Sequence, residues 1–202
     1  MARRRFVGLV AVLALAGAVD AQQPTKPAAG GDPQSTVEPR SDPGAGQKFL
    51  ARFVGEWDVA KAFYPRSGGE PARTRGICRQ TMIHGGRFLQ SDFEFGNGPS
   101  KSTGLGLIGF EPATGKFTSV WTDSRQTRMS FRQARERFDG RRIVLYSETL
   151  GGDPQGRLSR TVTELSEDGN RIVHRQYGVA ADGQERLVME LVMTRKPATT
   201  AR

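Results

Sequence analysis

From about residue 47 onward, the chain consists of short runs in which apolar and polar side chains alternate, separated by turn residues. This period of two predicts β-strands, because successive side chains of a strand point to opposite faces of a sheet. The pairs Asn97-Gly98, Asp139-Gly140 and Asp182-Gly183 lie between runs and suit tight hairpins, whose turns need positive φ angles. Ten strands are predicted, at residues 56–64, 72–83, 87–96, 103–111, 116–124, 127–138, 141–150, 157–166, 171–178 and 185–196.

Consecutive strands joined by short hairpins predict an all-β fold, an up-and-down antiparallel β-barrel of about ten strands. Closure is favoured because a closed barrel leaves no strand edge exposed. One stretch departs from the strand pattern: residues 48–54 place Phe49, Leu50 and Phe53 on one helical face. We expect a short N-terminal helical turn there, covering one end of the barrel.

The first and last strands carry a predicted contact. Trp57 lies near the start of the first strand, and Arg195 near the end of the last. By alternation, Arg195 continues an inward-facing series made up of Leu187, Met189, Leu191 and Met193. Because the first and last strands of a closed barrel are neighbours, we expect the Arg195 guanidinium to lie over the Trp57 indole as a structural closure of the barrel.

The N-terminus has the order of a secretory signal peptide: three Arg, an apolar run from Phe6 to Val19, and small residues before a cleavage site near Ala21. A membrane-spanning helix is the alternative, but it needs about 20 apolar residues, and this run has 14. We therefore expect an exported, soluble protein, periplasmic or secreted, with no transmembrane segment in the mature chain. The predicted organisation is signal peptide 1–21, Pro/Gly-rich disordered linker 22–46, barrel 47–196 and frayed tail 197–202.

The net charge of +9 falls to +7 once the signal peptide, with three Arg and one Asp, is removed. Basic residues are spread along the domain, and export argues against a nucleic-acid partner. The densest basic region, Arg125 to Arg142, is a candidate for weak association with anionic surfaces.

Cys78 is the single cysteine, so no disulfide can form within the chain, and we expect it to be a buried strand residue.

Several motifs resemble known families. Gly55-Glu56-Trp57, paired with Arg195, resembles the G-x-W signature of calycins, the lipocalin-like barrels. A longer pattern resembles the bacterial domain-of-unknown-function family numbered 1579, which implies a calycin-type barrel with no assigned activity. That pattern comprises Gly85-Gly86-Arg87-Phe88-Leu89, Gly104-Leu105-Gly106, Gly109-Phe110, Thr114-Gly115-Lys116-Phe117, Trp121-Thr122-Asp123-Ser124 and Thr194-Arg195-Lys196.

The chain departs from this pattern after Ser124, where Arg125-Gln126-Thr127-Arg128 replaces a small, Gly-containing turn. The resemblance therefore implies a bulkier and more basic barrel rim here. It leaves a ligand shared with the family less certain.

Five residues are candidates for ligand binding: Trp121, Asp123, Arg132, His174 and Tyr177. Alternation puts Trp121 and Asp123 on one face of their strand. If that face points inward, Asp123 is a buried carboxylate that needs a partner such as an Arg, and it marks a polar floor of a cavity. The alternative is a structural hydrogen-bonding cluster that holds the Trp121 hairpin.

His174 raises a second possibility through resemblance. Nitrobindins, haem-binding barrels related to calycins, use a His on a late strand as the axial iron ligand. This resemblance implies an alternative in which His174, with Asp123, serves haem binding or catalysis. An ordinary core or rim histidine is the other interpretation.

No residue set calls for a reaction. The sequence shows no metal-ligand spacing and no serine in a nucleophile elbow. Gly104-Leu105-Gly106 followed by Gly109 is similar to a dinucleotide fingerprint, but no helix follows it. We therefore predict no catalytic residues, no metal and no required cofactor, and a non-catalytic barrel that binds a small apolar or amphipathic molecule. A filled interior would instead indicate a structural role.

Overall fold

The computed structural model describes residues 37–38, 40–65, 67–148, 159–179 and 184–197. The chain divides into Met1–Arg40 and Ser41–Arg202, and the second unit holds the described helices and strands. The predicted signal peptide, most of the predicted linker and residues 198–202 of the predicted tail lie outside the described residues. Within the described part, no helix is long and apolar enough to cross a membrane.

A short helix precedes ten strands. The helix is α1 (Ala45–Ala51), and a single 3-10 turn, η2 (Gly98–Ser100), connects two of the strands. The strands are β1 (Gly55–Phe63), β2 (Ala72–Ile83), β3 (Phe88–Phe95), β4 (Ser102–Glu111), β5 (Lys116–Asp123), β6 (Ser130–Gln133), β7 (Arg142–Glu148), β8 (Ser159–Leu165), β9 (Arg171–Val179) and β10 (Glu185–Arg195).

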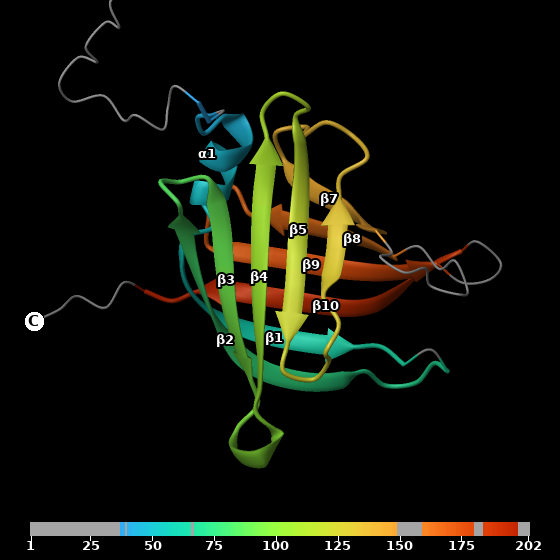
Figure 1. Cartoon of the computed structure of the whole chain (residues 1–202). Helices are drawn as coiled ribbons and strands as arrows, with labels where there is room; N and C mark the ends of the chain where they lie inside the picture. Colours follow the sequence, from blue (N-terminus) through green and yellow to red (C-terminus); the bar gives the residue numbers. More distant parts are fainter. Residues whose placement is uncertain (1–36, 39, 66, 149–158, 180–183, 198–202) are drawn as a thin grey trace, which may run out of the picture. The chain divides into compact units, whose positions relative to one another are not determined.

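The strands form one closed antiparallel barrel, as predicted (Figure 1). Each strand pairs with the next along the chain, and β1 closes the barrel by pairing with β10. In that closing pair Trp57 is opposite Arg195, and Val59 is opposite Met193. This register places the inward-facing residues of β1 opposite the inward-facing residues of β10.

Two elements differ from their predicted bounds by three residues or more. α1 begins at Ala45, three residues before the predicted start. Its first turn is capped by the Gln47 side chain, whose Oε1 accepts a hydrogen bond from the backbone N–H of Gly44 at 2.7 Å. β6 spans Ser130–Gln133 instead of residues 127–138. Residues 124–129 are exposed, and the segment lacks the apolar alternation that fixes a strand against the core.

A bulge interrupts β10 between Leu187 and Met189. Leu187 is paired with Tyr177, whereas Met189 is paired with Gln176. Since Tyr177 and Gln176 are on opposite faces of β9, the predicted inward series starts at Met189 and does not include Leu187.

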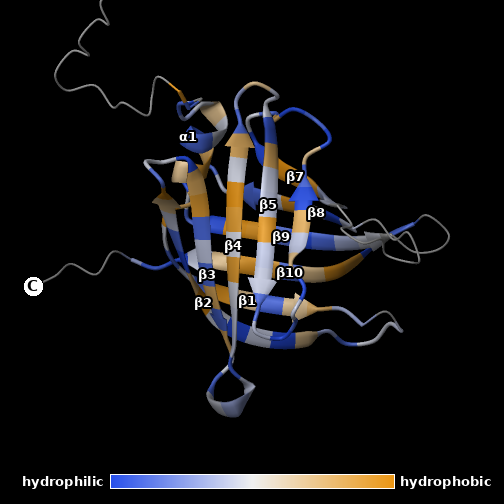
Figure 2. Cartoon of the chain, in the orientation of Figure 1, coloured by the Kyte–Doolittle hydropathy of each residue, from blue (hydrophilic) through white to orange (hydrophobic). Residues whose placement is uncertain are grey.

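The core lies inside the half of the barrel nearest α1. Figure 2 shows hydrophobic and hydrophilic residues following one another along the strands. We call this the closed half, and its buried inward-facing strand residues are Trp57, Val59, Cys78, Leu89, Phe117, Ile143, Ile172 and Met193. Leu50 and Phe53 from α1 and the turn after it are almost fully buried against them. The helix therefore covers this end of the barrel, as predicted, and Cys78 is buried on β2.

The predicted Arg195 contact is confirmed. The Arg195 guanidinium carbon lies 4.1 Å from the centre of the Trp57 ring. The same guanidinium donates to the carbonyl oxygens of Arg52 at 2.8 Å, Val54 at 2.6 Å and Gly169 at 2.8 Å. Arg195 thus ties β10 to the chain after α1 and to the β8–β9 turn.

Candidate functional site

Inward-facing side chains at the end away from α1 differ from those of the closed half, because most keep some accessible surface. We call this end the open half. Its partly accessible inward-facing residues are Lys61, Trp121, Asp123, Ser130, Arg132, Ser147, Ser159, His174, Gln176 and Met189. Apart from Met189, these side chains are polar or have a polar group, so the open half is a candidate binding site.

Trp121 and Asp123 are held together on the inner side of β5. The Trp121 Nε1 donates to the Asp123 Oδ2 at 2.9 Å, and the backbone N–H of Arg125 donates to Oδ1 at 2.8 Å. Asp123 therefore finds its partners within its own hairpin, in the arrangement expected of a cluster that holds the Trp121 hairpin. The carboxylate fixes the orientation of the indole.

Glycine makes room for the Trp121 ring. A Cβ on Gly104 would lie 2.3 Å from Trp121, well inside van der Waals contact, whereas a Cβ on Gly106 would lie 3.4 Å away. On its other side the ring meets Phe93 edge-on, at 5.5 Å between ring centres. The Gly-x-Gly pattern on β4 thus serves ring packing, as expected from the absence of a following helix.

Lys61 was not among the residues singled out from the sequence, although it shares its face with Trp57 and Val59. Its Nζ lies 4.7 Å from the centre of the Phe95 ring. Burial lowers the pKa of the Lys61 amine, and the positive charge of Arg125 lowers it further, while Asp123 partly opposes both. Strand alternation along β1 was the signal that would have found it.

Arg132 projects into the interior from the short strand β6, opposite Ser119 on β5 and Ser147 on β7. Its Nε is buried and has no hydrogen-bond partner among the residues that the structure describes. Burial also lowers the pKa of the guanidinium. A buried donor without an acceptor is costly. Among the described residues, this N–H and the Gln80 Oε1 are the buried side-chain groups without a hydrogen-bond partner.

His174 lies on β9, opposite Thr163 on β8 and Leu191 on β10. Its Nδ1 and the Thr163 Oγ1 are hydrogen-bonded at 2.8 Å. Burial, and after it the positive charge of Arg132, lowers the pKa of His174 to about 4. The imidazole is therefore neutral at pH 7, next to a cation.

Tyr177 is not brought together with the other candidates. Alternation along β9 places it on the outer face, where the Arg160 guanidinium carbon lies 4.6 Å from the ring centre. Arg160 in turn bonds the Glu185 carboxylate, with its Nε donating at 2.7 Å. The residue belongs to an outer Arg–Tyr stack.

The basic region Arg125 to Arg142 has no single face. Arg132 points inward, Arg135 stacks over the Tyr146 ring at 4.1 Å, and Arg142 pairs with Asp139 at 3.5 Å. These three arginines therefore do not form one continuous basic patch.

Two other chemistries find no support in the described residues. No group of three or more His, Cys, Asp or Glu side chains is arranged to hold a metal ion among them. The pKa of the Cys78 thiol is raised well above its usual range by burial and then by Asp92. The thiol is therefore protonated and has no nucleophilic role at neutral pH.

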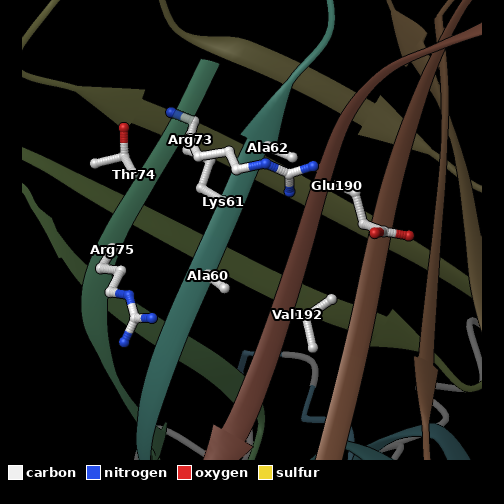
Figure 3. Close-up of a pocket in the computed structure, with 8 residues that line it drawn as sticks. All are labelled: Ala60, Lys61, Ala62, Arg73, Thr74, Arg75, Glu190 and Val192. Carbon is white, nitrogen blue, oxygen red and sulfur yellow. The ribbon is translucent and has the colours of Figure 1, made fainter. Parts of the chain in front are cut away.

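The outer surface carries a shallow groove of about 360 Å³ over β1. The short side chains of Ala60 and Ala62 form its floor, between two flanking strands (Figure 3). Arg73 and Arg75 of β2 stand on one side, and Glu190 and Val192 of β10 on the other. Its floor and flanks are formed by residues on the outer face of the sheet.

A ten-stranded closed antiparallel barrel, with a Trp of the first strand under an Arg of the last and with a polar inner face at the other end, is a calycin-like barrel. The chain belongs to the family described as "Protein of unknown function (DUF1579)", whose model matches residues 42–195. The predicted resemblance is thereby confirmed. No curated protein sequence is significantly similar to the chain.

Two solved structures show the same fold. The crystal structure of Rv2717c from M. tuberculosis is similar with a TM-score of 0.56 at 14% identity, over 77% of this chain and 100% of that one. The S-type phycobiliprotein lyase CPES from Guillardia theta is similar with a TM-score of 0.52 at 10% identity, over 76% of this chain and 94% of that one. At these identities the similarity concerns the fold alone.

Proposed function

We propose that the protein is a non-catalytic binder of a small amphipathic molecule, held inside the open half of the barrel. One observation carries this proposal: Trp121, Arg132 and His174 point inward yet keep accessible surface. The inward-facing residues nearer α1 on the same segments of chain are buried, namely Phe117, Ala134 and Ile172. Accessible surface on inward-facing side chains, in a barrel whose other end is packed, is what a site for a small ligand needs.

The lining supports an amphipathic ligand over a purely apolar one. Trp121 and Met189 keep some apolar surface accessible, and Phe93 packs edge-on against the Trp121 ring. Arg132 and His174 supply hydrogen-bonding groups, and an apolar ligand that covered them would leave them without partners.

Filling the interior tests the proposal. N-phenyl-1-naphthylamine, a neutral dye that fluoresces in apolar surroundings, is expected to bind with saturation at one molecule per barrel. Ser119→Phe places a ring on the inner face of β5 and should weaken dye binding at least tenfold. Thr118→Phe adds the same ring on the exposed outer face and is the matched control, expected to change binding less than twofold. Equal effects of the two variants, or no saturable binding to the wild type, would contradict the proposal.

Haem is the second candidate, and the neutral state of His174 favours it. The Nδ1 is bonded to Thr163, which leaves Nε2 as the nitrogen that would ligate iron. Haemin added to the purified protein should then give a shifted Soret band that His174→Ala abolishes. An unshifted spectrum removes this candidate and leaves the first untouched. Asp123 is bonded to Trp121 and to Arg125, so it offers no support for a shared His174–Asp123 catalytic pair.

Export is part of the same proposal. It rests on the sequence pattern of residues 1–21. Mass spectrometry of the protein purified from its own cells should find a mature N-terminus near Gln22. A periplasmic or culture fraction free of the protein would contradict it.

A further inference from the structure

We infer that the molecule held in the open half is an organic anion whose carboxylate-like head group pairs with Arg132. The inference rests on the proposed function, because it names the chemical class of the ligand at the same site. It applies to compounds with a small aromatic or aliphatic body and one acidic group.

The first argument is the unmet hydrogen-bonding capacity of Arg132. A guanidinium carries five N–H donors in a fixed fork, and buried charges in folded proteins are normally paired. Among the described residues, no carboxylate lies within ion-pair distance of Arg132, and its buried Nε has no acceptor. Asp123, the acidic residue on the described inner face of the open half, is already bonded to the Trp121 indole and the Arg125 backbone. A ligand oxygen would supply the acceptor that the described protein groups do not.

The second argument is the charge balance of the inner face. Among the described inward-facing residues of the open half, Lys61 and Arg132 are basic, and Asp123 is the acidic one. The positive charge of Arg132 is felt at His174, whose pKa it helps to lower. An anion next to Arg132 would relieve this excess of positive charge, while a cation would add to it.

The third argument is geometric. The Nε and one Nη of an Arg form a pair of parallel donors that match the two oxygens of a carboxylate or the oxygens of a sulfonate. Among the described residues, the Nε of Arg132 has no hydrogen-bond partner. Trp121 lies on the neighbouring strand β5, where Trp121 is opposite Ser130, two residues before Arg132. A head group on Arg132 would thus leave the body of the ligand within reach of the indole.

Two dyes that differ in a single group test the inference. 1-Anilinonaphthalene-8-sulfonate is N-phenyl-1-naphthylamine with one added sulfonate. For Arg132→Gln we expect the Kd of the anionic dye to rise at least tenfold and that of the neutral dye to change less than threefold. Arg79→Gln removes an equal charge from the exposed outer face of β2 and should change neither Kd more than twofold.

The outcomes separate the two proposals. If Arg132→Gln weakens both dyes equally, or neither, the anion inference is wrong while saturable binding of the neutral dye still supports the proposed function. If neither dye binds the wild type saturably, the proposed function fails, and the inference with it. If Arg79→Gln weakens the anionic dye as much as Arg132→Gln does, the anion binds the basic surface and the inference is wrong.

A measurement on the wild type keeps the test valid if Arg132→Gln does not fold. 1-Naphthoate and 1-naphthamide share a ring system and differ in charge. The naphthoate should displace the bound neutral dye at a concentration at least tenfold lower than the naphthamide. Equal displacement overturns the inference.

Discussion

The two halves of the barrel use the same residue types in opposite ways. In the closed half, the Trp57 ring is fully buried, its Nε1 donates to the Phe53 carbonyl at 3.0 Å, and Arg195 donates to three carbonyl oxygens. In the open half, Trp121 keeps accessible surface and the Nε of Arg132 has no partner among the described residues. A Trp and an Arg stabilise the fold at one end and are available to a ligand at the other.

The comparison separates groups that stabilise the fold from groups that a ligand could use. Groups that are fully satisfied contribute to the free energy of unfolding, while a binding site needs groups whose bonding capacity is left over. The same strands run through both halves of the barrel. A strand can therefore contribute residues to the core at one end and to the candidate site at the other.

Truncating the two tryptophans should give the largest contrast. Trp57→Ala removes a fully buried ring and is expected to lower the free energy of unfolding by about 3–5 kcal/mol, measured by urea denaturation. Trp121→Ala should cost less, about 1–2 kcal/mol, because water can enter the space that its half-buried ring leaves. Equal losses would show that the open half is packed like the core.

Acid should destabilise the protein through His174. Its pKa is about 4 in the folded state and near 6.5 in an unfolded chain, so the unfolded chain binds more protons between these values. Stability is therefore full above pH 6.5 and falls as the pH drops toward 4, by about 3 kcal/mol in total.

The variant His174→Gln isolates this contribution, because an amide does not titrate in that range. Urea denaturation at pH 7 and pH 4.5 should show a smaller loss for the variant than for the wild type. Identical pH profiles would mean that the imidazole is freely hydrated, and the open half would be wider than the structure shows.

Removing Arg195 probes the closure of the barrel. Arg195→Ala leaves three carbonyl oxygens without their charged donor and uncovers the Trp57 ring, so we expect a loss of about 2 kcal/mol. Arg142→Ala breaks an exposed ion pair with Asp139 and should stay within about 0.5 kcal/mol. An unchanged melting temperature for Arg195→Ala would show that the closed half does not depend on this contact.

A single methyl group distinguishes two glycines of β4. Gly104→Ala puts a Cβ 2.3 Å from the Trp121 ring, so the indole must move, at a cost of about 1–2 kcal/mol. Gly106→Ala, at 3.4 Å from the ring, should cost less and leave the tryptophan emission unchanged. The check is the emission spectrum together with the melting temperature, and a shift for Gly106→Ala alone would contradict the packing.

The barrel itself was largely predictable from the sequence. β2 was predicted with the bounds that the structure shows, and most other strands within one or two residues. The alternation of a two-faced strand and the Gly-containing turns are local signals, so they are readable without knowing the fold. The Trp57–Arg195 contact was also predictable, because closure makes the first and last strands neighbours.

The candidate site was predictable only in part, and the reasons are physical. Alternation put Asp123 on the same face as Trp121 but left open whether that face points inward. The bond between the two side chains depends on rotamers that no periodicity reveals. The bulge at Leu187 shifts the register of one residue without a sequence mark. The unmet donor of Arg132 depends on every neighbouring strand, so it is visible only in three dimensions.

The pairing of β1 with β10 has a consequence for how the chain acquires its structure. The two strands that complete the cylinder are the first and the last of the ten in order of synthesis. Their contact has a high sequence separation, so the entropy lost in joining them is large and folding is expected to be slow. Until β10 has paired, β1 and β9 each present an unpaired edge, and a chain at this stage is open to association with other chains. The pairing of β1 with β10 therefore also removes the exposed strand edges that would favour aggregation.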